Sequence, residues 1–125
     1  MLKCVLVGAG GFIGAVLRYL IGLIPIKGND AFPFKTLFIN VAGAFMIGII
    51  TALAERKNIN PNLVLMLQVG VCGGFTTFST FAYETSGLMK NGNTAQAVIY
   101  AVLSVVLCVL AVFAAQAAIK AVISR

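Results

Sequence analysis

Charged residues are scarce in this sequence. Asp, Glu, Lys and Arg together make up only 10% of the 125 residues, whereas 61% are hydrophobic, and the mean hydropathy is +1.06. A soluble domain carries about 25% charged residues. The composition therefore excludes a soluble domain and indicates an integral membrane protein. Because a helix needs about 20 apolar residues to cross a bilayer, the length allows about four spans with short loops and no second domain.

Histidine is absent, and cysteine occurs only at Cys4, Cys72 and Cys108. Without histidine the chain lacks the usual imidazole proton switch and metal ligand. The cysteines are odd in number, far apart and surrounded by apolar residues, so they indicate small buried side chains rather than a disulfide framework or zinc site. The sequence also lacks a Walker loop, a dinucleotide fingerprint and a nucleophile–base pair. We therefore expect no enzyme and no catalytic residue.

Acidic residues are few, three against nine Lys and Arg, which leaves a net charge of +6. In a soluble protein this excess would suggest nucleic acid. Here the basic residues lie mostly at span ends and in loops, where they bind lipid headgroups. We expect the lipid bilayer as a partner and no nucleic acid. The apolar run 5–24 has the length of a span and no small-residue cleavage site at its end, unlike a cleavable signal.

Four apolar segments predict an all-α membrane protein that forms a single transmembrane domain over residues 1–125. The third segment differs from the others because a polar, glycine-led stretch, Gly73–Phe81, interrupts it. Its first half, Leu63–Cys72, would make only about 15 Å of helix. We expect the glycine pair 73–74 to break this span within the membrane. The predicted spans are about 2–24, 35–54, 63–89 and 94–119.

The interrupted stretch Gly73–Phe81 contains two glycines, four hydroxyl side chains and three phenylalanines. Irregular backbone at membrane depth persists only where it is buried in protein or lines a wet cavity. Membrane proteins often place ion sites at such broken helices. The freed carbonyls of a break suit a cation, whereas the exposed N–H end of a half-helix and hydroxyls suit an anion. The stretch is therefore either a packed kink or the functional site.

Polar residues recur every four positions on two further spans. Thr36 and Asn40 share one face of the second span, and Tyr100, Ser104 and Cys108 share one face of the last. Hydrogen bonding between helices explains such residues, and for Asn40 the spacing alone favours that role. An amide N–H aimed at a permeating anion is the functional alternative. Taken with the interrupted third span, the stripes suggest a shared polar path.

Two side-chain types keep a structural and a functional interpretation open. Arg18 lies near the end of the first span, where it either reaches the headgroups or faces a water-filled vestibule that attracts anions. Phe78 and Phe81 share a helix face and alternate with Ser79 and Thr80. Phenylalanines at this spacing usually pack in a core, but the positive edge of a ring can also contact an anion in a pore.

The distribution of basic residues favours insertion in both orientations. Four spans place the termini and the loop 55–62 on one side of the membrane, and no internal repeat supplies a second half. Five basic residues on that side against four on the other leave almost no positive-inside preference. We therefore expect an antiparallel dual-topology homodimer. The two sets are Lys3, Arg56, Lys57, Lys120 and Arg125, and Arg18, Lys27, Lys35 and Lys90.

Three stretches of the sequence resemble the Fluc/CrcB family of fluoride channels: Gly10–Tyr19, Thr36–Gly43 and, most specifically, Gly73–Phe81. The resemblance covers essentially the whole chain. It implies an antiparallel homodimer with two separate pores in the bacterial cytoplasmic (inner) membrane. It also implies passive, selective export of fluoride from the cytoplasm, which lowers fluoride toxicity.

The resemblance further implies roles for individual residues. Phe78 and Phe81 correspond to a phenylalanine box, and Gly73 and Thr76 correspond to positions whose backbone carbonyls, from both subunits, hold a structural Na⁺ ion. Two positions depart from the family pattern: Lys35 stands where glycine is expected, and Cys108 stands where a further hydroxyl is expected. We leave Cys108 out of the predicted pore. The other residues that the resemblance assigns are Asn40, Ser79, Thr80, Tyr100 and Ser104 along the pore and Arg18 on the first helix, at a vestibule.

Two other functions fit a small membrane protein of four spans. A drug/proton antiporter would need a membrane-embedded carboxylate in the first span, and this chain has none there. Glu84, in the third span, is a poor substitute near the end of its half-helix. A non-conducting assembly subunit would explain the glycine faces but not the Thr-Phe run of Gly73–Phe81.

Overall fold

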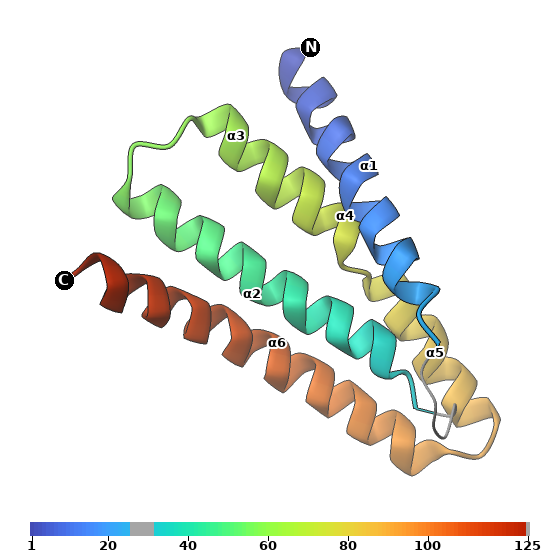
Figure 1. Ribbon diagram of the computed structural model, residues 1–125. Helices are drawn as coiled ribbons and strands as arrows, with labels where there is room; N and C mark the ends of the chain where they lie inside the picture. Colours follow the sequence, from blue (N-terminus) through green and yellow to red (C-terminus); the bar gives the residue numbers. More distant parts are fainter. Residues whose placement is uncertain (26–31, 125) are drawn as a thin grey trace.

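The computed structural model describes residues 1–25 and 32–124, which contain helices and no strand. Four segments are long and apolar enough to cross a membrane, as the sequence predicts. They run side by side or cross in a slender bundle (Figure 1). Part of the predicted loop after the first span, including Lys27, lies outside the described residues. The segments are α1 (Leu2–Gly22), α2 (Phe34–Arg56), the bent segment Pro61–Lys90, and α6 (Thr94–Ile123).

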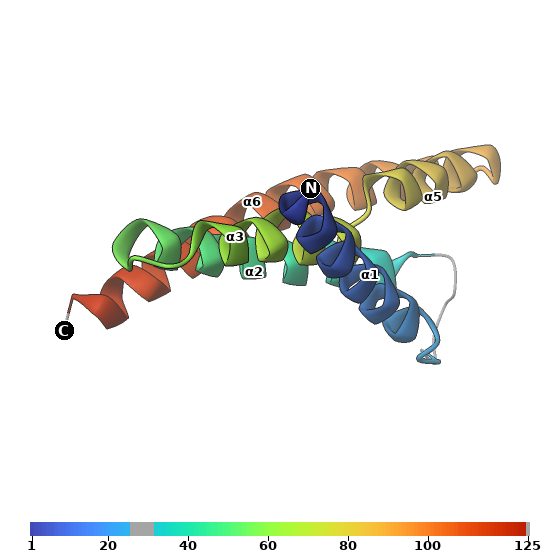
Figure 2. The ribbon, with the colours of Figure 1, turned by 90° about the horizontal axis from the view of Figure 1, so that it is seen from above.

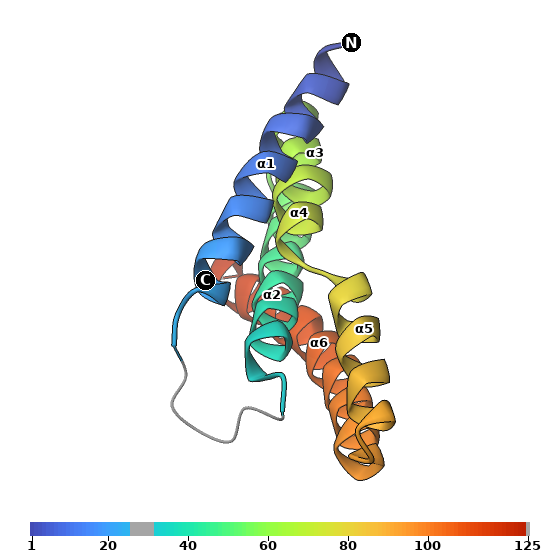
Figure 3. The same ribbon diagram turned by 90° about the vertical axis from the view of Figure 1, so that its right-hand side faces the viewer.

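The bent third segment begins where Pro61 occupies the first turn of α3 (Pro61–Leu65) and the Asn60 side chain accepts a hydrogen bond from Asn62 N at 2.9 Å. Pro lacks the N–H that this position leaves unpaired, and Asn is a preferred cap. The chain continues as a π-helix, η1 (Met66–Cys72), and a short helical turn, α4 (Gly73–Phe75), before α5 (Phe78–Lys90). Figure 3 shows the change of direction between α4 and α5.

The break in the third segment lies at Thr76 and Thr77, not at the glycine pair. Thr76 has ψ 158° and Thr77 has φ −150° and ψ 112°, both extended, whereas Gly73 is helical with φ −64° and ψ −38°. The prediction that Gly73 and Gly74 interrupt the helix is therefore wrong by about one turn. A glycine can adopt helical dihedrals, so its presence alone does not determine where a helix ends.

The glycines instead allow α1 to pack tightly against the third segment. A Cβ atom on Gly10 would collide with Met66 O, one on Gly14 with Val71 O, and one on Gly74 with Gly11 O. Only glycine lets two backbones approach this closely. Gly10 and Gly14 therefore form a packing surface of α1 for the third segment. Seen from above, α1 slants away from α2, α3 and α6 (Figure 2).

The helices α2 and α6 lie side by side along most of their length (Figure 1). Gly48 permits this contact, because a Cβ atom there would lie 2.8 Å from Val112 O and 2.9 Å from Ala115 Cβ. The last helix continues to Ile123, four residues past the predicted end at 119. A buried cluster of Leu88, Ala97 and Tyr100 joins α5 to α6 near their connecting turn. This arrangement places the polar stripes of α2 and α6 opposite the break.

Many large apolar side chains point away from the bundle. Phe12 is 72% exposed, Phe113 64% and Val122 71%. Such surfaces are unfavourable in water but match the hydrocarbon region of a bilayer. The chain is therefore a multi-pass membrane protein whose apolar outer faces meet lipid or another protein.

Candidate functional site

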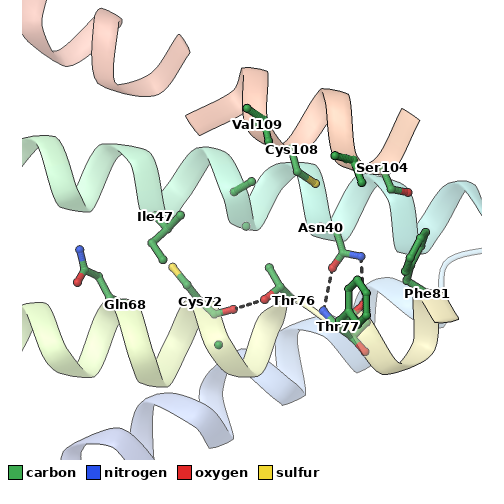
Figure 4. Close-up of a pocket in the computed structure, with 15 residues that line it drawn as sticks. Asn40, Ile47, Gln68, Cys72, Thr76, Thr77, Phe81, Ser104, Cys108 and Val109 are labelled. Carbon is green, nitrogen blue, oxygen red and sulfur yellow. Dashed lines mark hydrogen bonds between the residues drawn. The ribbon is translucent and has the colours of Figure 1, made fainter. Parts of the chain in front are cut away.

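The Asn40 side chain of α2 binds the main chain at the helix break. Its Oδ1 accepts from Thr77 N at 2.8 Å, and its Nδ2 donates to Thr77 O at 3.1 Å (Figure 4). Backbone groups that lose their helical partners at membrane depth must be satisfied by protein. The amide does this for Thr77 and leaves one of its own two N–H groups free of that pair. Asn40 is thus both a structural clamp and a donor at the site.

Thr77 also starts α5, a role that the sequence analysis missed. Its Oγ1 accepts from Thr80 N at 3.1 Å and donates to Thr80 Oγ1 at 2.9 Å. Ser79 Oγ lies 3.3 Å from the same oxygen. Threonine is a preferred N-cap residue, so its position directly before the helical run is a recognisable helix-start signal. The capped end of α5 presents the positive end of a helix dipole at the break.

A cavity of about 450 Å³ opens beside the break, between α2, η1, α5 and α6 (Figure 4). Its wall is largely apolar, with a few polar groups set into it, as in many ligand sites. The lining residues are Asn40, Gly43, Ala44, Ile47, Gln68, Cys72, Gly73, Thr76, Thr77, Phe78, Phe81, Ser104, Val105, Cys108 and Val109. The structure therefore brings residues from the three predicted polar elements to a single cavity.

Ser104 is the polar residue of α6 at this cavity. It is only 8% exposed, and its Oγ has no hydrogen-bond partner within the described residues. A buried hydroxyl without a partner costs about 1–3 kcal/mol, so proteins rarely retain one without a use. Cys108, one turn further along α6, lines the same cavity. We left Cys108 out of the predicted pore, but in the structure it lies beside Ser104 in the cavity wall.

The two phenylalanines of α5 have different surroundings. Phe81 packs between Phe78 and Tyr100, with ring centroids 5.3 Å and 5.1 Å away. Phe78 also lines the cavity, but 78% of its surface is exposed in the single chain. Phe81 is therefore partly a core residue, whereas Phe78 is free to contact lipid or another subunit.

Four predicted site residues are not among those lining the cavity. Tyr100 is fully buried in the cluster between α5 and α6. Ser79 and Thr80 lie on the first turn of α5 and bind Thr77 as described. Arg18 lies half-buried near the end of α1. The wall of the cavity therefore contains none of these four residues.

Two hydroxyl groups bind one carboxylate, Glu84, on the α5–α6 side of the break. Thr36 Oγ1 donates to Glu84 Oε1, and Tyr100 OH donates to Glu84 Oε2, both at 2.8 Å. Thr36 is buried and Glu84 half-buried. The sequence places Glu84 in the third span but does not indicate its partners. The sequence shows that Thr36 shares a helix face with Asn40. It does not show that α2, α5 and α6 meet at Glu84.

A second amide closes the opposite end of the cavity. Gln68 of η1 donates through Nε2 to Thr51 Oγ1 at 2.9 Å, and that hydroxyl donates to Ile47 O at 2.8 Å. Gln68 lines the cavity together with Cys72. The sequence does not indicate the contact of Gln68 with Thr51, because Gln68 lies in the apolar half of the third span. The π-helical turn that carries it is a form often found at functional sites.

The break also leaves two carbonyl groups without the main-chain partners of a continuous helix, as far as the described part of the chain shows. In a continuous helix the Gly73 carbonyl would accept from Thr77 N, and the Thr76 carbonyl would accept from Thr80 N. Here Thr77 N donates to Asn40 and Thr80 N donates to the Thr77 side chain. Carbonyl oxygens of this kind are the ligands that hard cations prefer. The donor set at Gly73 and Thr76 therefore fits a sodium ion.

These features define a class: a helical membrane protein of four spans whose third span breaks within the membrane beside a polar-lined cavity. Residues 5–116 match the family described as CrcB-like protein, Camphor Resistance (CrcB). The chain belongs to this CrcB-like family.

Several curated relatives carry the name "Fluoride-specific ion channel FluC". The protein from Rhizobium meliloti (strain 1021) is 44% identical over 120 residues, which cover 94% of this chain and 96% of the relative. The protein from Chlorobaculum tepidum is 49% identical over 102 residues, which cover 80% of each. The protein from Shewanella sp. (strain ANA-3) is 44% identical over 117 residues, 93% of this chain and 94% of the relative.

Proposed function

We propose that this protein is a fluoride-selective, passive ion channel. The observation that carries the proposal is its 44% identity, over 94% of its length, to a protein named as a fluoride-specific channel. The cavity supports an anion as the permeating species, because it joins the start of α5 to an amide and an unpartnered hydroxyl. The channel forms from the whole chain, residues 1–125, and involves no catalytic step.

Fluoride is small and strongly hydrated, so a selective pore must replace its water with hydrogen-bond donors while letting it leave. The free Nδ2 hydrogen of Asn40, the Ser104 hydroxyl and the positive end of α5 supply such donors. Phe78 and Phe81 add ring edges, which contact an anion without holding it tightly. The donors are few and neutral. This suits conduction better than tight storage.

The residues outside the cavity wall extend the proposed path beyond the cavity. Ser79, Thr80 and Tyr100 supply further hydroxyls along α5 and α6. Arg18 supplies a positive charge at a vestibule near the end of α1, where it attracts anions from solution. In this scheme fluoride leaves the cytoplasm down its gradient, and the toxicity of fluoride falls.

The functional unit in this proposal is an antiparallel homodimer in the bacterial cytoplasmic (inner) membrane. Balanced loop charges favour insertion in both orientations. The exposed Phe78 ring and the exposed Gly73 backbone lie together at the break, which suits contact with a second copy. A Na⁺ ion held by the carbonyls of Gly73 and Thr76 from both copies would neutralise their partial charges at the dimer axis. The dimer thus completes both the pore and the sodium site.

Family membership sets this proposal apart from a drug/proton antiporter or an assembly subunit. An antiporter needs a carboxylate that exchanges protons in the first span. In this chain α1 has no acidic residue, and both Glu84 oxygens accept hydrogen bonds. An assembly subunit predicts no ion flux at all.

The proposal is tested with purified protein in liposomes loaded with fluoride or chloride. An ion-selective electrode should record rapid fluoride efflux after a counter-ion pathway is opened, and no comparable chloride efflux. Absence of fluoride efflux from liposomes that contain folded protein would sink the proposal. Proton-driven efflux of an organic cation would instead identify an antiporter.

A further inference from the structure

Lys35 forms a bond between the ends of two helices. Its Nζ donates to Gly22 O at 2.8 Å. Gly22 is the last residue of α1, whose final turn contains no basic residue of its own. Lys35 is the second residue of α2, where a cation faces the positive end of its own helix dipole. Its ammonium group instead meets the negative end of α1, so the contact with α1 fixes where this charge lies.

Lys35 directly precedes Thr36 in the sequence, and Thr36 binds the Glu84 carboxylate. Thr36 donates to Glu84 Oε1, and Tyr100 donates to the other oxygen. An ionised carboxylate beside a proposed pore residue repels an entering anion. A channel for anions therefore needs compensating positive charge at this end.

Three described basic residues lie at the end of the bundle where α1 ends and α2 begins. Arg18 precedes Gly22 by four residues, so both share one face of α1. Lys90 is the last residue of α5 and is exposed. Lys35 alone among the three has a hydrogen bond in the structure as described, and it anchors the charge to α1. The charge of Lys35 is thus held in place, one residue from Thr36.

We propose that Lys35 is an electrostatic entry residue for the pore. Its positive charge offsets Glu84 and raises the rate at which fluoride enters the mouth formed by the start of α2. This inference rests on the proposed channel function. Charge near a mouth raises the local concentration of a counter-ion, and salt screens that effect.

A purely structural role for Lys35 predicts a different salt response. If the bond to Gly22 O only clamps α1 onto α2, its loss changes stability and flux to the same extent at every ionic strength. An electrostatic role weakens as salt rises, because the screening length falls from about 30 Å at about 0.01 M to about 3 Å at about 1 M. Salt dependence therefore separates the two roles.

The test compares wild type with Lys35→Met and Lys35→Arg in liposomes. Fluoride efflux is measured at about 0.01 M and about 1 M ionic strength, set with potassium gluconate on both sides. We expect Lys35→Met to lower the initial rate about two- to fivefold at low salt and to match wild type at high salt. Lys35→Arg keeps the charge, so its efflux rate should equal that of wild type at both ionic strengths.

Lys57 provides a matched control, since it directly follows the opposite end of α2. Lys57→Met removes the same charge far from Gly22 and should not reproduce the salt-dependent loss. An equal loss in both Met variants overturns the assignment to Lys35. So does a Lys35→Met rate equal to wild type at low salt, or a loss that high salt leaves unchanged.

Failure of the channel proposal is distinguishable in the same experiment. If wild type releases no fluoride, the channel proposal fails and the role of Lys35 fails with it. If wild type conducts and Lys35→Met does too, only the role of Lys35 is overturned. Size-exclusion profiles of each variant before reconstitution report folding. Lys35→Gln, which also removes the charge but keeps a polar side chain, replaces Lys35→Met if that variant does not fold.

Discussion

Asn40 and Thr77 are 37 residues apart in sequence and form a pair of hydrogen bonds across the break in the third span. The side-chain amide of α2 replaces the main-chain partners that a continuous helix would supply at this point. Because the same amide borders the cavity, the stability of the break and the chemistry of the site depend on one side chain.

Replacing Asn40 should therefore damage both stability and conduction. Asn40→Ala leaves Thr77 N and Thr77 O without these partners, which should lower the free energy of unfolding by about 1–3 kcal/mol. We expect fluoride efflux to fall at least about tenfold, since misplacing the break by even a small distance disrupts binding geometry. Thermal unfolding in detergent and liposome efflux measure the two effects. Phe38→Leu, at an exposed position on the same helix, is the control, and equal losses in the two variants would contradict a special role for Asn40.

Replacing Ser104, unlike replacing Asn40, should lower fluoride efflux without lowering stability. Its hydroxyl is buried and has no partner within the described residues, so Ser104→Ala removes an unsatisfied group and should leave stability unchanged or slightly raised. Fluoride efflux should nevertheless fall several-fold, because a donor is lost from the path. Efflux equal to that of wild type would show that Ser104 only fills space.

The two phenylalanines of α5 should respond differently to replacement by isoleucine. Phe81→Ile loses contacts with both Phe78 and Tyr100, which should cost about 1 kcal/mol of stability and impair fluoride flux while leaving the dimer intact. Phe78→Ile should reduce flux with little loss of stability in the single chain, because the ring is 78% exposed. Unchanged flux in Phe81→Ile would assign that ring to packing alone. Cross-linking in detergent reports the dimer.

The close contact of α1 with the third segment should tolerate no side chain at Gly14. In Gly14→Ala the new Cβ atom would lie 2.7 Å from Phe75 N and collide with Val71 O. Overpacking of this kind costs about 1–3 kcal/mol. Gly8→Ala, where no atom lies within 4 Å of the new Cβ, is the matched control and should be neutral or stabilising. Equal melting temperatures for the two variants would contradict the packing role.

Removal of sodium tests the carbonyl site at Gly73 and Thr76. If a shared Na⁺ ion neutralises carbonyls at a dimer axis, replacing sodium by N-methylglucamine should lower the melting temperature of the dimer and slow fluoride efflux. Li⁺, a smaller hard cation that also prefers oxygen ligands, should restore part of the loss. Identical melting and efflux with and without sodium would refute the sodium site. The Ser104→Ala variant should keep the full sodium response.

The sequence by itself determined the class of protein and most of its elements. Composition requires a bilayer, apolar length sets four spans, and the stretch Gly73–Phe81 marks the interrupted one. Period-four spacing also placed Thr36 with Asn40 and Ser104 with Cys108, because residues four apart share a helix face. These are local properties, so they can be read without knowing which helices are neighbours.

Only the tertiary structure decided how those faces meet. The break lies at Thr76 and Thr77 rather than at the glycine pair, because Asn40 from another helix satisfies the backbone there. Of that pair, Gly74 lies against α1, whose backbone approaches it too closely for any side chain. The bonds of Glu84 to Thr36 and Tyr100, and the bond of Lys35 to α1, likewise depend on contacts between distant segments. Helical spacing defines the faces of one helix, but packing between helices selects their partners.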